Sequence, residues 1–399
     1  MTVFHKAFRY TLEPTPAQVA NLTAWTPALR FVWNWMLAQR RDAYRASEGR
    51  VRIGFAEQSA QLVPLKRLHP WLAEVPSQVL QQTLRDLDTA FQRFFAGSAG
   101  YPAFKSKQRG DVPGLRWPQG VEVNGRAVWL PKLGWVKARL SRPTEGIVKS
   151  ATVRWDGLRW IVSILCEIER EAPAPNSGAA VGLDVGVEES VAVSDGRLVN
   201  LPVASEDEAK RMRLLARRVS RCVPGSRRHA KAKRRLLVFR RKIGNRVHDA
   251  RHKTTTQLAK NHGLLCVEDL ALRNMTRSAR GSVEVPGKNV AAKRGLNRSL
   301  LEQGHAETVR QLAYKAGWLG GEVRAVNPAY TSQTCPCCGH VSPANRPARA
   351  VFRCIQCGHS GHADVIAAQN ILAAGLAVSA RGGGLQTSDE SGTIREHAA

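Results

Sequence analysis

The sequence is short of acidic residues and has no long apolar segment. Sixty Lys or Arg face thirty-two Asp or Glu, so the formal net charge of the 399 residues is +28. No apolar run approaches the roughly 18 residues of a membrane-spanning helix, and the N-terminus lacks the apolar core of a secretion signal. Hydrophobic residues still make up 43%, which excludes wholesale disorder. We therefore expect a cytoplasmic protein whose partner is a polyanion, nucleic acid before any other.

Cysteine is sparse outside one short segment. Three of the eight cysteines are scattered, whereas five lie within residues 335–357. A secreted disulfide scaffold would spread its cysteines through a small chain, so this clustering indicates metal chemistry in a reducing compartment. Two CxxC pairs separated by 15 residues have the spacing of a structural four-cysteine zinc site. The predicted ligands are Cys335, Cys338, Cys354 and Cys357, with Cys337 as a surplus thiol.

The pattern of apolar residues divides the chain into two parts. In the first part an alternating strand opens the chain, and two helices follow at about residues 16–46 and 76–95. Residues 97–120 are rich in Gly, Pro and basic side chains, so we expect a loop there. Between about residues 120 and 170, short alternating runs predict a small antiparallel sheet or barrel, which the opening strand can join.

In the second part, after a linker at residues 171–178, strands alternate with helices, which favours an α/β fold. Strands are expected at residues 180–184, 190–194, 197–201, 264–267 and 322–326. Helices are expected at about residues 205–260, at about 300–318 and from about 362. A polar loop is expected at residues 276–297, and the tail from residue 381 is expected to be disordered.

Three acidic residues stand out by their positions. Asp184 and Glu268 each end an apolar strand, and Asp364 lies in the first turn of the helix after the cysteines. Acids at the ends of adjacent parallel strands, with a third from a packing helix, can converge on one edge of a sheet. Because like charges raise each other's pKa, such a cluster favours cations, typically two Mg²⁺ ions at a scissile phosphate. Each acid taken singly could also be a helix cap or turn residue, and Asp269 is a second choice that strand alternation sends to the opposite face.

Taken in order, these elements resemble TnpB, the RNA-guided nuclease of bacterial and archaeal insertion sequences and the ancestor of type V CRISPR effectors. The resemblance covers nearly the whole chain. It rests on RFVWNWMLAQR (30–40), YPAFKSK (101–107), LPKLGWVKARL (130–140), GLDVGVEESVAVSDG (182–196), HKTTTQLAKNHGLLCVEDLALRNM (252–275), NPAYTSQTCPCCG (327–339), FRCIQCG (352–358) and HADVIAAQNIL (362–372).

The resemblance implies an α/β multi-domain fold. A RuvC-like (RNase H-type) nuclease domain carries an inserted four-cysteine zinc ribbon and is preceded by a wedge β-barrel with an inserted helical recognition domain. The implied boundaries are residues 1–13 for the first wedge strand, 14–98 for the recognition domain, 99–172 for the barrel, 173–331 for the RuvC-like domain with its basic insertion at 205–260, 332–361 for the ribbon, 362–380 for the last RuvC-like helix and 381–399 for a disordered tail.

The resemblance also implies an activity, which is cleavage of double-stranded DNA next to a short target-adjacent motif. The family is guided by an RNA from the end of the same element, and base pairing reads the sequence. Its catalytic, metal-binding carboxylates fall on Asp184, Glu268 and Asp364, with two Mg²⁺ ions that Mn²⁺ can replace. Its ligands for one structural Zn²⁺ fall on the four paired cysteines. The expected partners are guide RNA and target DNA, with no membrane, and a monomer is favoured.

More than half of the excess charge lies in residues 210–253, which hold 18 Lys or Arg and one acid, Asp249. Interleaved apolar residues predict helices with one buried stripe, turned at residues 223–226. So long a basic run repels itself without a polyanion, and we expect phosphate contacts. The candidates are Arg227, Arg228, Lys231, Arg234, Arg235, Arg240, Arg241 and Lys242. Gln78 and Gln81 are candidates for pairing with adenine in the target-adjacent motif; an exposed helical Gln is the alternative.

Three other functions stay open at this point. A non-cleaving RNA-guided DNA-binding regulator is disfavoured by the three acids, and a plasmid-cleavage assay with Mg²⁺ decides it. An actin-like kinase or ATPase would use residues 182–196 as a phosphate loop, but the required second Gly-rich phosphate motif is missing. A compact type V CRISPR effector is separated from the leading hypothesis only by its genomic context.

Overall fold

The structure is a computed structural model that describes residues 1–107, 110, 112–186, 190–282 and 284–380. The chain divides into two compact units, Met1–Glu171 and Ala172–Ala399. Each unit has its own hydrophobic core, and the two are described separately below. The tail that the sequence predicts to be disordered lies outside the described residues. Among the described helices, none is long and apolar enough to cross a membrane.

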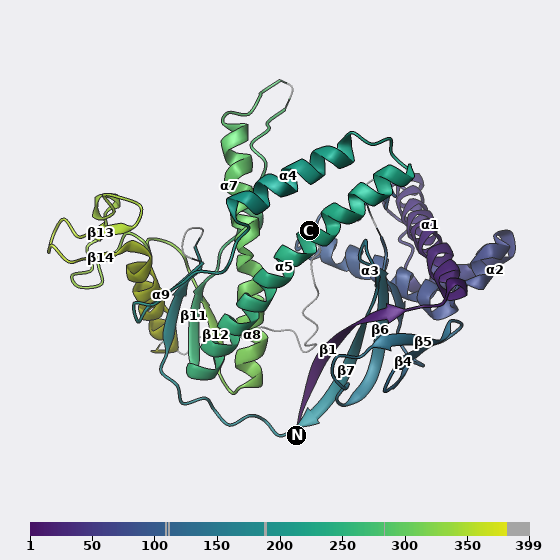
Figure 1. Ribbon diagram of the computed structural model, residues 1–399, viewed down its shortest axis with the longest axis horizontal. Coiled ribbons are helices and arrows are strands. Elements are labelled where there is room, and N and C mark those ends of the chain that lie inside the picture. The colour runs from purple at the N-terminus through teal and green to yellow at the C-terminus, as the bar shows by residue number, and fades with distance from the viewer. Residues whose placement is uncertain (108–109, 111, 187–189, 283, 381–399) are drawn as a thin grey trace. The chain divides into compact units, whose positions relative to one another are not determined.

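The first unit contains a seven-stranded antiparallel sheet in the order β2-β6-β7-β1-β5-β4-β3 (Figure 1). Its strands are β1 (Thr2–Glu13), β2 (Leu115–Trp117), β3 (Glu122–Asn124), β4 (Ala127–Leu130), β5 (Gly134–Arg139), β6 (Ile147–Trp155) and β7 (Trp160–Arg170). The opening strand does join this sheet, pairing with β7 along nearly its whole length. Strand β2 lies inside residues 97–120, where a loop is expected, and its Leu115 and Trp117 are fully buried. Three residues are too few to show the alternation of apolar and polar side chains that predicts a strand.

Helices α1 (Pro16–Ala46), α2 (Phe55–Leu68) and α3 (Ser77–Phe95) and the short η1 (Pro70–Glu74) complete the first unit. Thr15 starts α1 with a capping box, in which its side chain accepts from Gln18 N and the Gln18 side chain accepts from Thr15 N. The stripe predicted for α1 is buried: Leu22, Trp25, Leu29, Trp33 and Met36. Burying one such side chain stabilises the fold by roughly 1.5–3 kcal/mol.

The second unit is built on a five-stranded sheet in the order β10-β9-β8-β11-β12. Strand β11 pairs in parallel with β8 and β12, whereas β9 and β10 are antiparallel. The strands are β8 (Val181–Asp184), β9 (Val191–Val193), β10 (Leu198–Val199), β11 (Leu264–Glu268) and β12 (Glu322–Val326). The helices are α4 (Glu206–Ser220), α5 (Arg227–Asn261), α6 (Leu272–Met275), α7 (Val290–Gln303), α8 (His305–Trp318) and α9 (Ala363–Ala380).

Strand alternation gives this sheet two different faces. On β11, Leu265 and Val267 pack with Leu258 of α5 and Leu312 of α8. Cys266, between them in sequence, packs on the other face with Ile371 of α9. Helix α9, coloured yellow, therefore covers one face of the sheet, while α8 and the end of α5 cover the other (Figure 1).

Two glycines let α9 approach the sheet closely. A Cβ on Gly182 of β8 would collide with the carbonyl oxygen of Ala368 in α9, and a Cβ on Gly375 of α9 would collide with the Cys266 sulfur. Because neither glycine has a side chain at the point of contact, the helix lies directly on the strands. This packing fixes where the first turn of α9 meets the end of the sheet.

The segment before β12 differs from the expected loop and single helix. Helix α7 begins at Val290, inside the expected loop, and α8 follows after one residue, Gly304. Gly304 has φ +61°, and a Cβ there would lie 2.6 Å from Nη2 of Arg251, which donates to the Gln303 carbonyl at 2.9 Å. The helix breaks there because Gly304 has a left-handed backbone conformation. Glycine is required at this position because Arg251 leaves no room for a side chain.

Candidate metal centres and nucleic-acid interface

Two of the predicted acids end neighbouring parallel strands. Strands β8 and β11 pair with Leu183 opposite Val267, so the next residues, Asp184 and Glu268, end the two strands side by side. The residues just before them, Leu183 and Val267, face the core formed with α5 and α8. Side chains alternate along a strand, so Asp184 and Glu268 lie on the opposite face, which α9 covers. Asp364 lies in the first turn of α9. The rival Asp269 is exposed, and its backbone N–H donates to the Val326 carbonyl at 2.9 Å.

The electrostatics show that Glu268 and Asp364 both act on Asp184. The pKa of Asp184 is raised to about 7, mainly by burial and also by the charges of Glu268 and Asp364, while Arg346 opposes the rise. Burial also raises the pKa of Glu268, opposed by the Thr331 hydroxyl, which donates to Glu268 Oε1 at 2.6 Å. A cluster of this kind is costly to ionise without added positive charge. The edge of the sheet is therefore suited to cations.

Arg346 is a residue of this site that sequence reasoning missed. Its Nη2 donates to Asp364 Oδ1 at 3.0 Å. Its Nε and Nη2 also donate to the Arg349 carbonyl, at 3.0 and 2.7 Å. Arg346 lies between the two CxxC pairs among several other basic residues, and nothing in the sequence distinguishes it from them as a residue of the site. The contact links the cysteine-bearing segment directly to the acidic edge.

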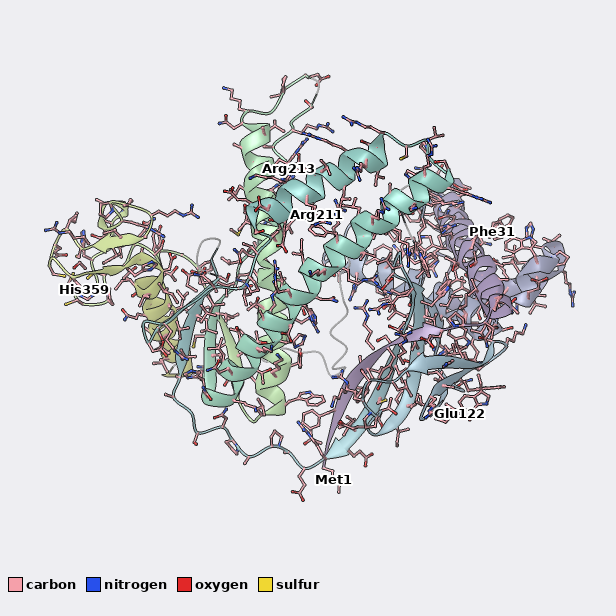
Figure 2. The ribbon with its side chains drawn as sticks, in the orientation of Figure 1. Met1, Phe31, Glu122, Arg211, Arg213 and His359 are labelled. Atoms are coloured by element: carbon pink, nitrogen blue, oxygen red, sulfur yellow. The ribbon has the colours of Figure 1, made fainter. Side chains whose placement is uncertain are left out.

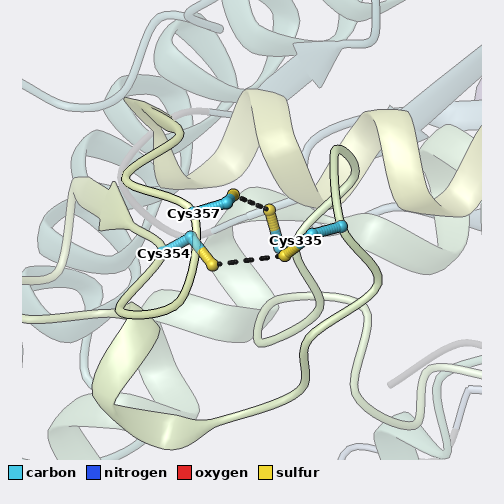
Figure 3. A group of neighbouring side chains, drawn as sticks. Cys335, Cys354 and Cys357 are labelled. Carbon is cyan, nitrogen blue, oxygen red and sulfur yellow. Dashed lines mark hydrogen bonds between the residues drawn. The ribbon is translucent and has the colours of Figure 1, made fainter.

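The four predicted cysteines do meet. The Cys335 and Cys357 sulfurs are 3.5 Å apart and those of Cys338 and Cys354 are 3.6 Å apart (Figure 3). All four sulfurs lie within 4.8 Å of one another, and Cys337 is not a member of this group. Four thiols at this separation fit a tetrahedral structural Zn²⁺, whose ligands are thiolates.

The fold around the cysteines holds the two pairs together. Gly339 and Gly358, one after each pair, have φ +75° and +76°, and their N–H groups donate to the Cys335 and Cys354 carbonyls. The fully buried Asn345 of η2 (Pro343–Asn345) donates to the His340 carbonyl and accepts from Ile355 N. The short strands β13 (Val351–Arg353) and β14 (Ser360–His362) then lead into α9.

One further group of possible ligands meets within 4.8 Å in the described part of the chain: His248, His252 and Glu307. Arg310 already binds both oxygens of Glu307 at 2.7 Å. Lys315 lies beside the group and donates to the His252 carbonyl at 2.8 Å. Two cations so close disfavour a third, so we interpret this group as a polar network that packs α5 on α8.

The basic helices α4 and α5 enclose a hollow of about 630 Å³. Apolar side chains line it together with six cations: Arg211, Arg218, Lys231, Arg234, Arg235 and Lys242. Four of these are predicted phosphate-binding residues, and Arg228 lines an adjoining hollow. Arg211 and Arg213 both project from α4 (Figure 2). The expected turn at residues 223–226 does separate the two helices.

The two glutamines proposed to read the target-adjacent motif lie on α3 and differ in exposure. Gln81 is exposed, whereas Gln78 is half-buried. Within the described residues, the buried Oε1 of Gln78 has no hydrogen-bond partner. Their role stays a prediction.

Known proteins resemble this chain over nearly its whole length. Family models described as "Helix-turn-helix domain", "Probable transposase" and "Cas12f1-like, TNB domain" match residues 1–49, 163–279 and 305–371. The chain is 42% identical to the "Putative RNA-guided DNA endonuclease InsQ" of Escherichia coli (strain K12), over 94% of each chain. It is 32% identical to a "Putative RNA-guided DNA endonuclease" of Streptomyces pristinaespiralis, over 97% of this chain and 93% of that one.

The fold is shared with a solved structure, "Cryo-EM structure of the Cas12f1-sgRNA-target DNA complex". The TM-score is 0.50 at 15% identity, covering 89% of this chain and 82% of that chain. The chain is thus an α/β protein that shares the fold of this structure and has a four-cysteine cluster beside an acidic sheet edge. Because the chain is 42% and 32% identical to these relatives over nearly their full length, it belongs to the TnpB family, as its motifs predict.

Proposed function

We propose that the protein is a transposon-encoded, RNA-guided endonuclease that cleaves double-stranded DNA by metal-dependent phosphodiester hydrolysis. The observation that carries the proposal is the convergence of Asp184, Glu268 and Asp364, with the pKa of Asp184 at about 7. Relatives that match over almost their full length are named "Putative RNA-guided DNA endonuclease". The short target-adjacent motif belongs to the proposal as an inference from the family.

The domain assignments are part of this proposal. Residues 173–331 and 362–380 would form the RuvC-like domain, supported by the sheet with three parallel strands and α9 packed on its acidic face. Residues 1–13 and 99–172 would form the wedge barrel, supported by the pairing of β1 with β7. Residues 14–98 would be the recognition domain, supported by the helices inserted between β1 and β2.

The three carboxylates fit a pair of Mg²⁺ ions by donor chemistry, because hard cations prefer carboxylate oxygens. They are not gathered as tightly as the four sulfurs, since they form no group within 4.8 Å in the described chain. When bound, such ions activate a water and stabilise the leaving oxygen of a phosphodiester.

The chain's own residues orient this site. Thr331 fixes one oxygen of Glu268 by its hydrogen bond, and Arg346 holds one oxygen of Asp364. Arg346 also offers positive charge where a phosphate would arrive, which favours the developing charge of phosphoryl transfer. One Zn²⁺ on the four cysteines would be structural, because four thiolates leave no open position for a substrate.

The proposed partners are a guide RNA and its target DNA. The six cations that line the hollow of α4 and α5 face a common space without an acidic residue among them. Such a surface suits closely spaced phosphates, whose binding releases counterions. This polymer would be held by one segment of the second unit and cut at another.

The proposal is tested by Asp184→Ala in the RNA-bound protein, with a guide-matched plasmid and Mg²⁺. Cleavage should be lost while co-purified RNA stays at the wild-type level, because Asp184 lies on β8, away from the basic helices in sequence. Asp269→Ala is the matched control: it removes an exposed neighbouring acid and should cut normally. Undiminished cleavage by Asp184→Ala would contradict the proposed site.

A further inference from the structure

The first unit contains a pocket of about 520 Å³ between the C-terminal parts of α1 and α3 and the segments that follow them. This volume is typical of small-ligand sites. Aromatic rings dominate its wall: Tyr44, Phe91, Phe94, Phe95 and Tyr101. Neither the proposed nuclease site nor the basic helices of the second unit involve these residues.

The rings form a packed set that is buried at one end and open at the other. Phe91, 8% exposed, anchors it in the core, and its centroid lies 5.6 Å from the Tyr101 ring, edge to face. Phe94 meets Tyr101 in the same way at 5.4 Å. Phe95 and Tyr101 are nevertheless 69% and 47% exposed. Rings held in place by one another, with free faces in a hollow, are suited to stacking against a flat ligand.

All the charged residues that line the pocket are positive. Arg40, Arg41, Arg45 and Arg52 line the pocket, and no acidic residue does. Arg40 is committed to Asp88 and lies over the Phe91 ring at 5.0 Å, and Arg41 is paired with Asp42. Arg45 and Arg52 are exposed and form no ion pair with any residue that the structure describes. The pocket therefore offers stacking surfaces and two available guanidinium groups.

We propose that this pocket binds one unpaired nucleotide of the guide RNA, with the base stacked on Phe95 or Tyr101 and the phosphate on Arg45 and Arg52. Aromatic faces next to basic side chains are the usual means of holding unpaired bases. A second copy of the chain is a poorer occupant, because it would bring the same positive rim against this one. The inference rests on the proposed function, since it takes the bound polymer to be RNA.

Two hydroxyl groups favour RNA over DNA as the occupant. Tyr44 and Tyr101 both contribute to the wall, and a phenol can donate to or accept from a 2′-hydroxyl, the group that only RNA carries. The Tyr44 ring lies against Gly49, where φ is +87° and a Cβ would come 3.2 Å from the Tyr44 hydroxyl oxygen. The glycine thus keeps space for the tyrosine beside the arginines.

The test combines crosslinking with affinity. The wild-type complex, with RNA carrying 4-thiouridine, is irradiated, and the modified peptides are located by mass spectrometry; adducts on Phe95 or Tyr101 are expected. Phe95→Ala should weaken binding of the guide RNA about 5- to 100-fold, the loss expected for one stacked base. Phe95→Trp should restore binding. Trp155→Ala, at an exposed ring elsewhere in the same unit, should bind as wild type does.

The outcomes separate this inference from the proposed function. Wild-type protein that binds no RNA would refute both. Wild-type protein that binds RNA, with no adduct in the pocket and unchanged affinity for Phe95→Ala, would refute the pocket alone. Adducts obtained only with single-stranded DNA would overturn the choice of RNA. A concentration-dependent dimer that Phe95→Ala abolishes, with RNA binding unchanged, would show that the pocket is a protein interface.

Discussion

At the residue scale, Arg346 is the side chain that connects the two candidate metal centres. It lies between the CxxC pairs, yet its guanidinium contacts Asp364 and lowers the pKa of Asp184. Without it, the acidic edge would lose the positive charge that opposes the rise in the pKa of Asp184. We therefore expect its effect on cleavage to exceed any effect on the fold.

Replacing Arg346 by Ala should slow plasmid cleavage about 100-fold, the size found when one preorganised electrostatic group is removed from an active site. Arg346→Lys should recover part of the rate, since it keeps the charge but loses the forked geometry. The zinc content should stay at one per chain. Arg353→Ala, an exposed arginine of the same segment, serves as control; equal losses in both variants would mean that the segment, not the guanidinium, matters.

The sequence predicts the acids of the site better than their partners. Asp184 and Glu268 are recognisable because an acid that ends an apolar strand has a defined place in a parallel sheet. Arg346 precedes Asp364 by 18 positions, and a contact across a folded loop depends on how that loop closes. Thr331 is hidden for the same reason, since its hydroxyl reaches Glu268 across 63 positions.

At the element scale, the four-cysteine cluster is expected to hold the entrance to α9. Cys338→Ser should reduce bound zinc from one per chain to nearly none and lower the melting temperature, because metal-binding energy is folding energy in such sites. Cys337→Ser, at the neighbouring exposed thiol, should change neither value. Metal analysis and thermal melts of both variants measure this; full zinc occupancy in Cys338→Ser would contradict the ligand assignment.

The close contact between β8 and α9 gives a second prediction at this scale. Gly182→Ala should destabilise the second unit by about 1–3 kcal/mol, because the added methyl meets backbone that cannot move aside cheaply. Gly317→Ala, in α8 with open space around it, should be neutral or slightly stabilising. Urea unfolding followed by circular dichroism compares the two variants; equal stability would show that α9 does not lie on the strand in this way.

The sequence predicts a helix or strand well when the pattern that indicates it lies within that element. The long apolar stripe of α1 and the amphipathic pattern of α3 predict both helices to within a residue or so of their ends. Helix α2 was missed because it contains Pro64 and buries few side chains. The break at Gly304 was missed because its cause, Arg251, lies more than fifty positions earlier.

At the scale of the whole molecule, the basic hollow of α4 and α5 and the three acids of the candidate site lie on different segments. The chain carries +28, while the three acids of the candidate site lie at the ends of β8 and β11 and the start of α9. A polymer that binds through its phosphates should be held mainly by counterion release, with an affinity that falls steeply with salt.

The triple variant Lys231→Gln, Arg235→Gln, Lys242→Gln tests this electrostatic binding, because all three residues line the hollow of α4 and α5. The slope of log affinity for RNA against log salt should fall by about 2, at roughly 0.7 per lost phosphate contact. The charge-preserving triple Lys231→Arg, Arg235→Lys, Lys242→Arg should keep the wild-type slope. An unchanged slope in the glutamine variant would place RNA elsewhere.

The short path from the last cysteine to the third acid has a consequence for the cell. Only β14 and its turn separate Cys357 from Asp364, so the residue that completes the acidic cluster is presented by a loop that a bound Zn²⁺ would close. A chain that emerges when zinc is scarce would still pack α9 on the sheet at Gly182 and Gly375, but the loop that leads into Asp364 would stay open. Zinc supply would then set how firmly the third acid is held, so a nuclease carried by a mobile element would work less well in a zinc-poor host.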